Sequence, residues 1–168
     1  MTTEKELSKR KPNRLNSFDY SQNGAYFVTI CAKNKEHLFG AVGASIARPS
    51  KVILSEYGKI TDQAIKSITK IYPNVIVDKY VIMPNHIHMI LIIQSENGRA
   101  MLVPTISTVI AQMKGYISKK IGHSIWQKSF YDHIIRNEQD YVEIWQYIEN
   151  NPAKWTQDKF YTGDETNG

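Results

Sequence analysis

The sequence predicts an α+β domain built on one antiparallel sheet, and three observations lead to this prediction. Short stretches rich in β-branched and aromatic residues occur along the chain. Longer stretches have apolar residues at steps of three and four positions, which is typical of helices. The two kinds follow the order strand, helix, strand, strand, helix, strand, helix. A split β-α-β/β-α-β arrangement accounts for the first six elements and leaves the last helix as an addition.

Four segments have the composition of strands, namely residues 25–31, 75–83, 86–94 and 125–136. The first is apolar on both parities, which predicts a central position in the sheet. The second and third flank a tight Pro84-Asn85 turn, as in a hairpin. Together they predict a ferredoxin-like antiparallel sheet with helices on one face.

Three segments have helical periodicity, namely residues 55–71, 104–121 and 138–151. Pro73, Gly122 and Pro152 follow them and act as helix stops. Glycine and proline between residues 40 and 49, and polar residues between 95 and 99, predict two loops.

The composition narrows the classes of function. The chain has 168 residues, the size of one domain, and a formal net charge of +5, which favours a polyanionic partner. One cysteine, Cys31, excludes an intramolecular disulfide and a cysteine-based zinc cluster. Neither a membrane span nor a secretory signal is recognisable, so we expect a cytoplasmic protein. The expected parts are a basic tail (1–16), one domain (17–155) and a polar tail (156–168).

Two histidines, His86 and His88, lie two positions apart on a predicted strand. The period of a strand puts both imidazoles on one face, while Ile87 points into the core. Two adjacent imidazoles form half of a metal site. The alternative is a pair of surface histidines on an open sheet face. The strand around them is strongly apolar, and buried polar rings need partners, so both interpretations remain open.

The last predicted helix offers further candidates. Its expected core stripe is Tyr141, Ile144, Trp145 and Ile148. Tyr147 lies about 100° around the helix from Ile148, and Asn151 follows one turn later on the same face. This face offers a phenol and an amide oxygen. The alternative is a boundary tyrosine and an ordinary helix-terminal asparagine before proline.

The segment MPNHIHMIL resembles the histidine–hydrophobic–histidine motif of the HUH endonucleases, in particular the single-tyrosine transposases of bacterial insertion sequences. The resemblance is closest to the REP-associated tyrosine transposases, relatives of those enzymes that are associated with repetitive extragenic palindromes. Four further blocks, residues 18–31, 38–40, 126–136 and 147–152, resemble that family in the same order. The resemblance therefore covers most of the chain.

The resemblance implies a role for each matching residue. His86 and His88 match metal ligands, Asn151 the third ligand and Tyr147 the nucleophile. The insertion-sequence branch usually has glutamine where this chain has Asn151, so the asparagine favours the REP-associated branch. The implied metal is Mg²⁺ or Mn²⁺, and the implied partner is single-stranded DNA folded into a hairpin.

The implied chemistry is physically consistent. A divalent cation neutralises the oxygens of a phosphodiester and orients the group for in-line attack. Attack by a tyrosine leaves a 5′-phosphotyrosine and a free 3′-hydroxyl. The covalent link conserves the bond energy, so the strand can be rejoined without ATP.

Other residues are weaker candidates. Asp132 and His133 precede the tyrosine helix on opposite faces of a strand, so at most one faces the metal site. Tyr131 and Tyr141 are rival nucleophiles. The basic residues that are either DNA contacts or solvated charges are Arg10, Lys11, Arg14, Lys114, Lys119, Lys120 and Arg136.

Two other functions remain from the sequence. One is a non-catalytic DNA-binding protein of the same fold. The other is a small-molecule metallohydrolase that uses His86 and His88. The sequence shows no paired carboxylates near these histidines, which argues against this alternative. The oligomeric state is also open, because a site of this kind is formed within one chain or between two.

Overall fold

The computed structural model describes residues 24–43, 51–94 and 103–163. Its main sheet has four strands in the order β4-β5-β1-β6, and neighbouring strands are antiparallel. The strands are β1 (Gly24–Cys31), β4 (Val75–Ile82), β5 (His86–Ile93) and β6 (Tyr131–Ile135). This is the predicted split β-α-β arrangement with β1 and β5 at its centre, so the fold class is confirmed.

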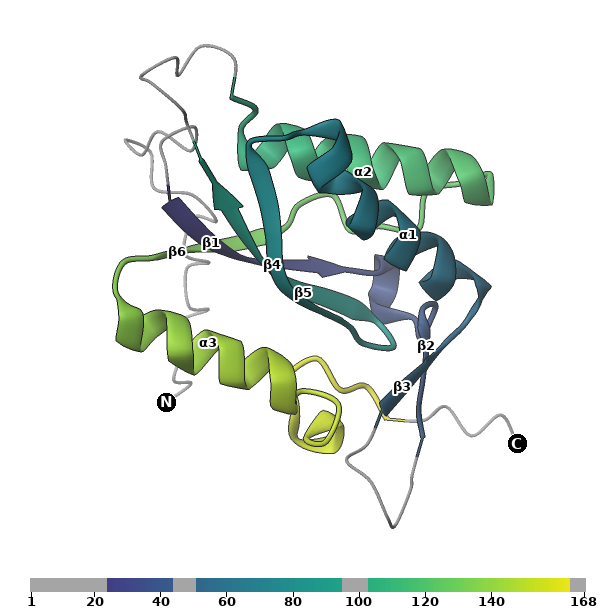
Figure 1. Ribbon diagram of the computed structural model, residues 1–168. Helices are drawn as coiled ribbons and strands as arrows, with labels where there is room; N and C mark the ends of the chain where they lie inside the picture. Colours follow the sequence, from purple (N-terminus) through teal and green to yellow (C-terminus); the bar gives the residue numbers. More distant parts are fainter. Residues whose placement is uncertain (1–23, 44–50, 95–102, 164–168) are drawn as a thin grey trace, which may run out of the picture.

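Three helices cover the sheet, namely α1 (Glu56–Ile71), α2 (Ile106–Ile121) and α3 (Glu138–Asn150). Helices α1 and α2 lie together on one face, and α3 lies on the other (Figure 1). Each begins at a side-chain cap, which Ser55, Thr105 and Asn137 provide for a backbone N–H of the first turn. Among the described residues, no helix combines the length and hydropathy needed to cross a membrane.

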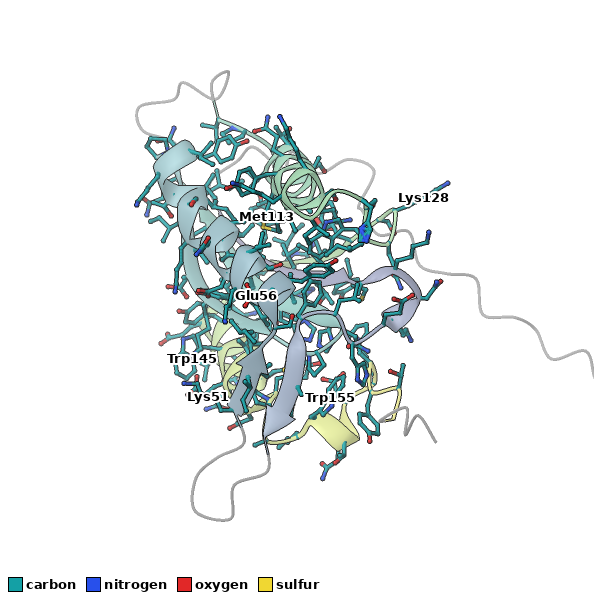
Figure 2. All side chains as sticks on the ribbon, turned by 90° about the vertical axis from the view of Figure 1, so that its right-hand side faces the viewer. Lys51, Glu56, Met113, Lys128, Trp145 and Trp155 are labelled. Carbon is teal, nitrogen blue, oxygen red and sulfur yellow. The ribbon has the colours of Figure 1, made fainter. Side chains whose placement is uncertain are left out.

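The alternation of side chains along the central strands separates the two faces. Ile87 and Leu91 of β5 belong to the main apolar core, together with Ile65 of α1 and Val109 of α2. The residues of the other parity, including His86, therefore face the side that α3 covers. Figure 2 shows Trp145 and Trp155 on the opposite side of the sheet from Met113 of α2.

The loop predicted over residues 40–49 is wrong at its start. Residues 40–43 form β2 (Gly40–Gly43), which pairs with β3 (Lys51–Leu54) in a separate two-stranded sheet. The glycines of β2 hide the apolar alternation by which a strand is recognised. Gly40 is required here, because a Cβ at this position would lie 2.2 Å from the Ile53 carbonyl oxygen.

The fourth strand is shorter than predicted, because only Tyr131–Ile135 of residues 125–136 is β6. The preceding loop is bound to α2 instead, where the Lys114 Nζ donates to the carbonyls of Gln127 at 2.9 Å and Ser129 at 3.2 Å. Trp126 forms an isolated bridge with Ala32 and packs in the core from this loop.

The turn before His86 is held by the chain that follows β1. The Ala32 N–H donates to the Asn85 carbonyl at 2.9 Å, and the Phe39 N–H donates to the Pro84 carbonyl at 3.0 Å. The predicted Pro84-Asn85 turn is therefore present and fixed at both of its residues. This attachment gives the first histidine of β5 a defined backbone position.

The core stripe predicted for the last helix is largely wrong. Ile148 is buried, but Tyr141 and Ile144 are half-buried and Trp145 is exposed. Polar contacts to the edge strand replace apolar burial. The Tyr141 hydroxyl donates to Asp78 at 2.5 Å, and the Lys79 ammonium lies 4.0 Å from the Trp145 ring centre.

Candidate active site

His86 and His88 lie side by side on β5, and both are buried. Their ring centres are 4.5 Å apart. They share the sheet face opposite α1 and α2, whereas Ile87 between them is part of the main core. Both imidazoles therefore lie on one face of the sheet, as the alternation along the strand predicted. The two rings are not surface histidines on an open face.

The hydrogen bonds around His86 determine which of its nitrogens carries the proton. The Asn85 amide group donates to the Phe160 carbonyl at 2.8 Å and the Lys35 carbonyl at 3.3 Å. Its Oδ1 must therefore accept from His86 Nδ1, which lies at 2.7 Å. Nε2 is then left with a lone pair, and this atom is buried without a hydrogen-bond partner.

His88 is held in a similar way. Its Nδ1 lies 2.8 Å from the hydroxyl of Thr29 on β1, and its Nε2 lies 3.4 Å from the hydroxyl of Tyr147. Burial lowers the pKa of His88 well below its usual value and lowers the pKa of His86 to about 4. Both rings are therefore neutral at physiological pH, which is the form that binds metal.

Asn151 is the C-cap residue of α3 and is also buried. Its Nδ2 donates to Asp158 Oδ2 at 2.6 Å. A carboxylate only accepts hydrogen bonds, so this contact fixes which side of the amide is the oxygen. That oxygen, Oδ1, is buried without a hydrogen-bond partner, as is His86 Nε2.

These side chains fit a divalent metal ion. Ligand atoms of His86, His88 and Asp158 all lie within 4.8 Å of one another. Two buried lone pairs without partners, on His86 and Asn151, are a feature that a bound cation explains. Two imidazoles with amide and carboxylate oxygens suit Mg²⁺ or Mn²⁺, and the imidazoles favour Mn²⁺ of the two.

Tyr147 borders this cluster from α3. Its hydroxyl lies 3.4 Å from His88 Nε2 and 3.4 Å from Asp158 Oδ2, and its ring packs edge-on against Phe27. The side chain is 39% exposed, and the burial of its inner part with the negative Asp158 nearby raises its pKa to about 12. A pocket of about 440 Å³ lined by Tyr147, Asn151 and Asp158 adjoins it on the outer side.

Sequence reasoning missed Asp158 and Phe160. Both lie in the segment predicted as a polar tail from residue 156. We call the described part of this tail, together with Trp155, the C-terminal segment (residues 155–163). Trp155 begins this segment, and the Phe160 ring centre lies 4.5 Å from that of His86. The aromatic residues within an otherwise polar stretch were the available signal that it packs against the protein.

The rival tyrosines and the residues before α3 have other surroundings. Tyr141 donates to Asp78 on the edge strand. Tyr131 lies on the site face, across β1 from His88, because both pair with Thr29. His133 shares this face but contacts Asp140 of α3 at 2.8 Å. Asp132 pairs with the core residue Val28 and so faces the other side, which confirms that the two face opposite ways.

The basic candidates are separated from this cluster or lie outside the described residues. Lys114 is occupied by the two loop carbonyls, and burial lowers its pKa. Lys119 and Lys120 end α2, on the opposite face of the sheet. Arg136 is exposed after β6. Arg10, Lys11 and Arg14 lie outside the described residues.

Comparisons with known proteins agree with this architecture, although no protein-family model matches the chain. An uncharacterised protein of Haemophilus influenzae is 35% identical over 172 residues, covering 90% of this chain and 93% of its own. A second protein of that organism, named "putative REP-associated tyrosine transposase", is 25% identical over 145 residues, covering 81% of this chain and 74% of its own.

A solved structure of a REP-associated tyrosine transposase bound to a REP hairpin has the same fold, with a TM-score of 0.63. The match covers 87% of this chain and 76% of that chain at 23% identity. Similarity to these relatives supports a transposase-like, DNA-processing function. The chain is similar in sequence and fold to REP-associated tyrosine transposases, which confirms the resemblance of its motifs.

Proposed function

We propose that this chain is a metal-dependent, single-tyrosine transesterase of the HUH class that cleaves and rejoins hairpin-forming single-stranded DNA. One observation supports it most. The hydroxyl of Tyr147 lies 3.4 Å from Nε2 of His88, beside two buried and unpartnered ligand atoms, His86 Nε2 and Asn151 Oδ1. A nucleophile and a metal-ligand cluster in contact are the two parts that such a reaction requires.

His86, His88 and Asn151 would hold the cation, since His86 Nε2 and Asn151 Oδ1 are buried without partners, and Asp158 fixes the orientation of the Asn151 amide. When bound, the cation supplies charge neutralisation at the non-bridging oxygens of the phosphodiester. Asn85 and Thr29 keep the two imidazoles in their ligating orientation through their other ring nitrogens.

Tyr147 is the nucleophile in this proposal. Its oxygen forms a bond to phosphorus while the bond from phosphorus to the 3′ oxygen breaks, and that oxygen takes up a proton to become a hydroxyl. The raised pKa of Tyr147 means that its proton must be removed during attack. Asp158 Oδ2, 3.4 Å from the phenol oxygen, is in position to accept it.

The proposed substrate is a DNA hairpin with a single-stranded flank, of the repetitive extragenic palindrome kind. The relative of known structure is described as bound to a REP hairpin. The net charge of +5 suits a polyanionic partner. Because Tyr147 reaches His88 of the same chain, we further propose that one chain forms a complete site.

A covalent-capture assay tests this function. The protein is incubated with Mn²⁺ and labelled hairpins from the DNA around its own gene, and denaturation-resistant adducts are measured. We expect an adduct that is lost in Tyr147→Phe and in His86→Ala. Tyr131→Phe and Tyr141→Phe are matched controls, and both should still form the adduct.

Two outcomes would contradict the proposal. An adduct that survives Tyr147→Phe but not Tyr131→Phe would make Tyr131 the nucleophile. Tight hairpin binding without any adduct would favour the non-catalytic DNA-binding protein.

The metallohydrolase alternative keeps one supporting feature, because Asp158 supplies a carboxylate beside the histidines. Its test is hydrolysis of a small phosphodiester that survives Tyr147→Phe.

A further inference from the structure

A second, smaller hollow adjoins the histidine cluster on the same sheet face. It has a volume of about 150 Å³ and lies between Thr29 of β1, the loop before β6, Tyr131 and Phe160. Thr29 is the partner of His88, and the Phe160 ring packs on His86. The hollow and the cluster therefore share a wall, and a group bound in the hollow would lie next to a group bound at the cluster.

Aromatic rings and positive charges border this hollow. Tyr131 is 47% exposed, although its ring packs edge-on against Phe27. The Lys159 ammonium lies 5.1 Å from the Phe160 ring centre and 5.9 Å from that of Tyr131. The Lys35 ammonium also lies 6.0 Å from the Phe160 ring centre. Proteins usually bind single-stranded nucleic acid in this way, because bases stack on aromatic rings while lysines attract the phosphate backbone.

The loop side of the hollow offers hydrogen-bonding groups on a fixed backbone. Gln127 and Ser129 line it, and the Lys114 ammonium holds both of their carbonyls. The Gln127 N–H also donates to the Cys31 carbonyl at 3.0 Å. Within the described residues, neither the Gln127 amide nor the Ser129 hydroxyl has a side-chain hydrogen bond. An amide can pair with the edge of a nucleobase.

We propose that this hollow is a nucleobase-binding subsite, which takes the unstacked base of a nucleotide next to the phosphate that Tyr147 attacks. This inference rests on the proposed function for the position of that phosphate. Tyr131 stacks on the base, Gln127 contacts its edge and Lys159 contacts the adjoining backbone. The subsite would make the choice of cleavage position depend on the identity of one flanking base.

The test uses Tyr147→Phe protein, so that binding is measured without cleavage. Hairpins from the DNA around the gene carry 2-aminopurine at one flank position at a time, and fluorescence is recorded on binding. We expect one position to respond, and the response to disappear with Tyr131→Leu but to persist with Tyr131→Phe. An abasic nucleotide there should weaken binding roughly tenfold, and Tyr131→Leu should remove that difference.

Controls separate a local effect from a loss of folding. Tyr116→Leu removes an exposed tyrosine from α2 on the opposite face and should leave the response unchanged. Lys159→Ala provides a second variant if Tyr131→Leu proves unstable, and it should lower hairpin affinity and the slope of its salt dependence. Lys119→Ala is its matched control.

The results distinguish this subsite from the proposed chemistry. If native protein forms the covalent adduct but no flank position responds, the subsite is rejected and the function stands. If one position responds but no adduct forms, the subsite stands and the chemistry is rejected. If Tyr147→Phe protein, which retains Tyr131, binds hairpins with intact and abasic flanks equally well, the subsite is rejected. If it binds no hairpin, the subsite and the proposed function are both rejected.

Discussion

Asp158 is the residue whose role the structure adds to the expected site. Its Oδ2 accepts from Asn151 Nδ2, and its Oδ1 accepts from the Phe160 N–H at 2.7 Å. One carboxylate thus orients a proposed ligand and anchors the C-terminal segment. An amide at this position could still accept from Asn151, whereas a methyl group could not.

We therefore predict that Asp158→Ala lowers the affinity for Mn²⁺ by about 10- to 100-fold, the usual effect of losing a group that orients a ligand. Asp158→Asn should lose much less. Calorimetric titration of Mn²⁺ measures both, with the exposed Glu56→Ala as a control. Equal losses in the two Asp158 variants would instead make the carboxylate a direct ligand.

The buried histidines make stability depend on pH. Burial lowers the pKa of His86 in the folded protein to about 4, below the value of about 6.5 in an unfolded chain. Between these values the unfolded chain binds more protons, so the free energy of unfolding falls as pH falls from 6.5 to 4. This contribution is fully present above pH 6.5 and is lost at low pH.

The expected loss from His86 is on the order of 3 kcal/mol at pH 4. Because glutamine cannot be protonated, His86→Gln should flatten the decline in this window. Urea unfolding at a series of pH values without added metal measures it. Parallel curves for native protein and His86→Gln would show that this ring does not titrate as its burial requires.

At the scale of elements, α3 is attached to the sheet by polar contacts more than by apolar burial. Tyr141 donates to Asp78, Lys79 pairs with Glu149, and only Ile148 of this helix is buried. Asp78 interrupts the regular register between β4 and β5, and this irregularity turns its carboxylate toward the helix. The position of Tyr147 therefore depends on the contacts of Tyr141, earlier in the helix, and of Glu149, just after it.

We predict that Tyr141→Phe slows adduct formation severalfold without abolishing it, because the helix keeps Ile148 but loses one anchor. The loss of stability should not exceed about 1 kcal/mol, since the bond is largely exposed to solvent. Single-turnover adduct rates and urea unfolding measure the two effects. Tyr116→Phe on α2 should change neither, and an unaltered rate in Tyr141→Phe would remove the proposed role of this anchor.

The elements that could be predicted are those with local signals. The alternation around His86 and the helical spacing from Tyr147 to Asn151 place each side chain on its face before any contact is known. Asp158 could not be found in this way, since its partners are set by how the C-terminal segment folds back. The strands β2 and β3 were missed for a similar reason, because each is defined mainly by the other.

At the scale of the whole molecule, the proposed site draws on residues of one chain that are far apart in the sequence. The histidines come from the central strand β5, Tyr147 from α3, Asn151 from the C-cap of that helix, and Asp158 from the segment that follows. The loop that leads from β6 to α3 is short, and the Tyr147 hydroxyl lies 3.4 Å from Nε2 of His88 in its own chain. This contact favours the proposed single-chain site over a site shared between two subunits, in which a tyrosine from one chain serves the histidines of the other.

Mixing two inactive variants tests this directly. Tyr147→Phe keeps the metal ligands, and His86→Ala keeps the tyrosine. If the site is formed within one chain, neither variant has a complete site, and the mixture should form no more adduct than the two variants do separately. If the tyrosine acts on the partner's metal site, mixed dimers contain one complete site, and adduct should return to about a quarter to half of the native yield. Restored adduct would therefore reject the single-chain arrangement while leaving Tyr147 and His86 in their proposed roles.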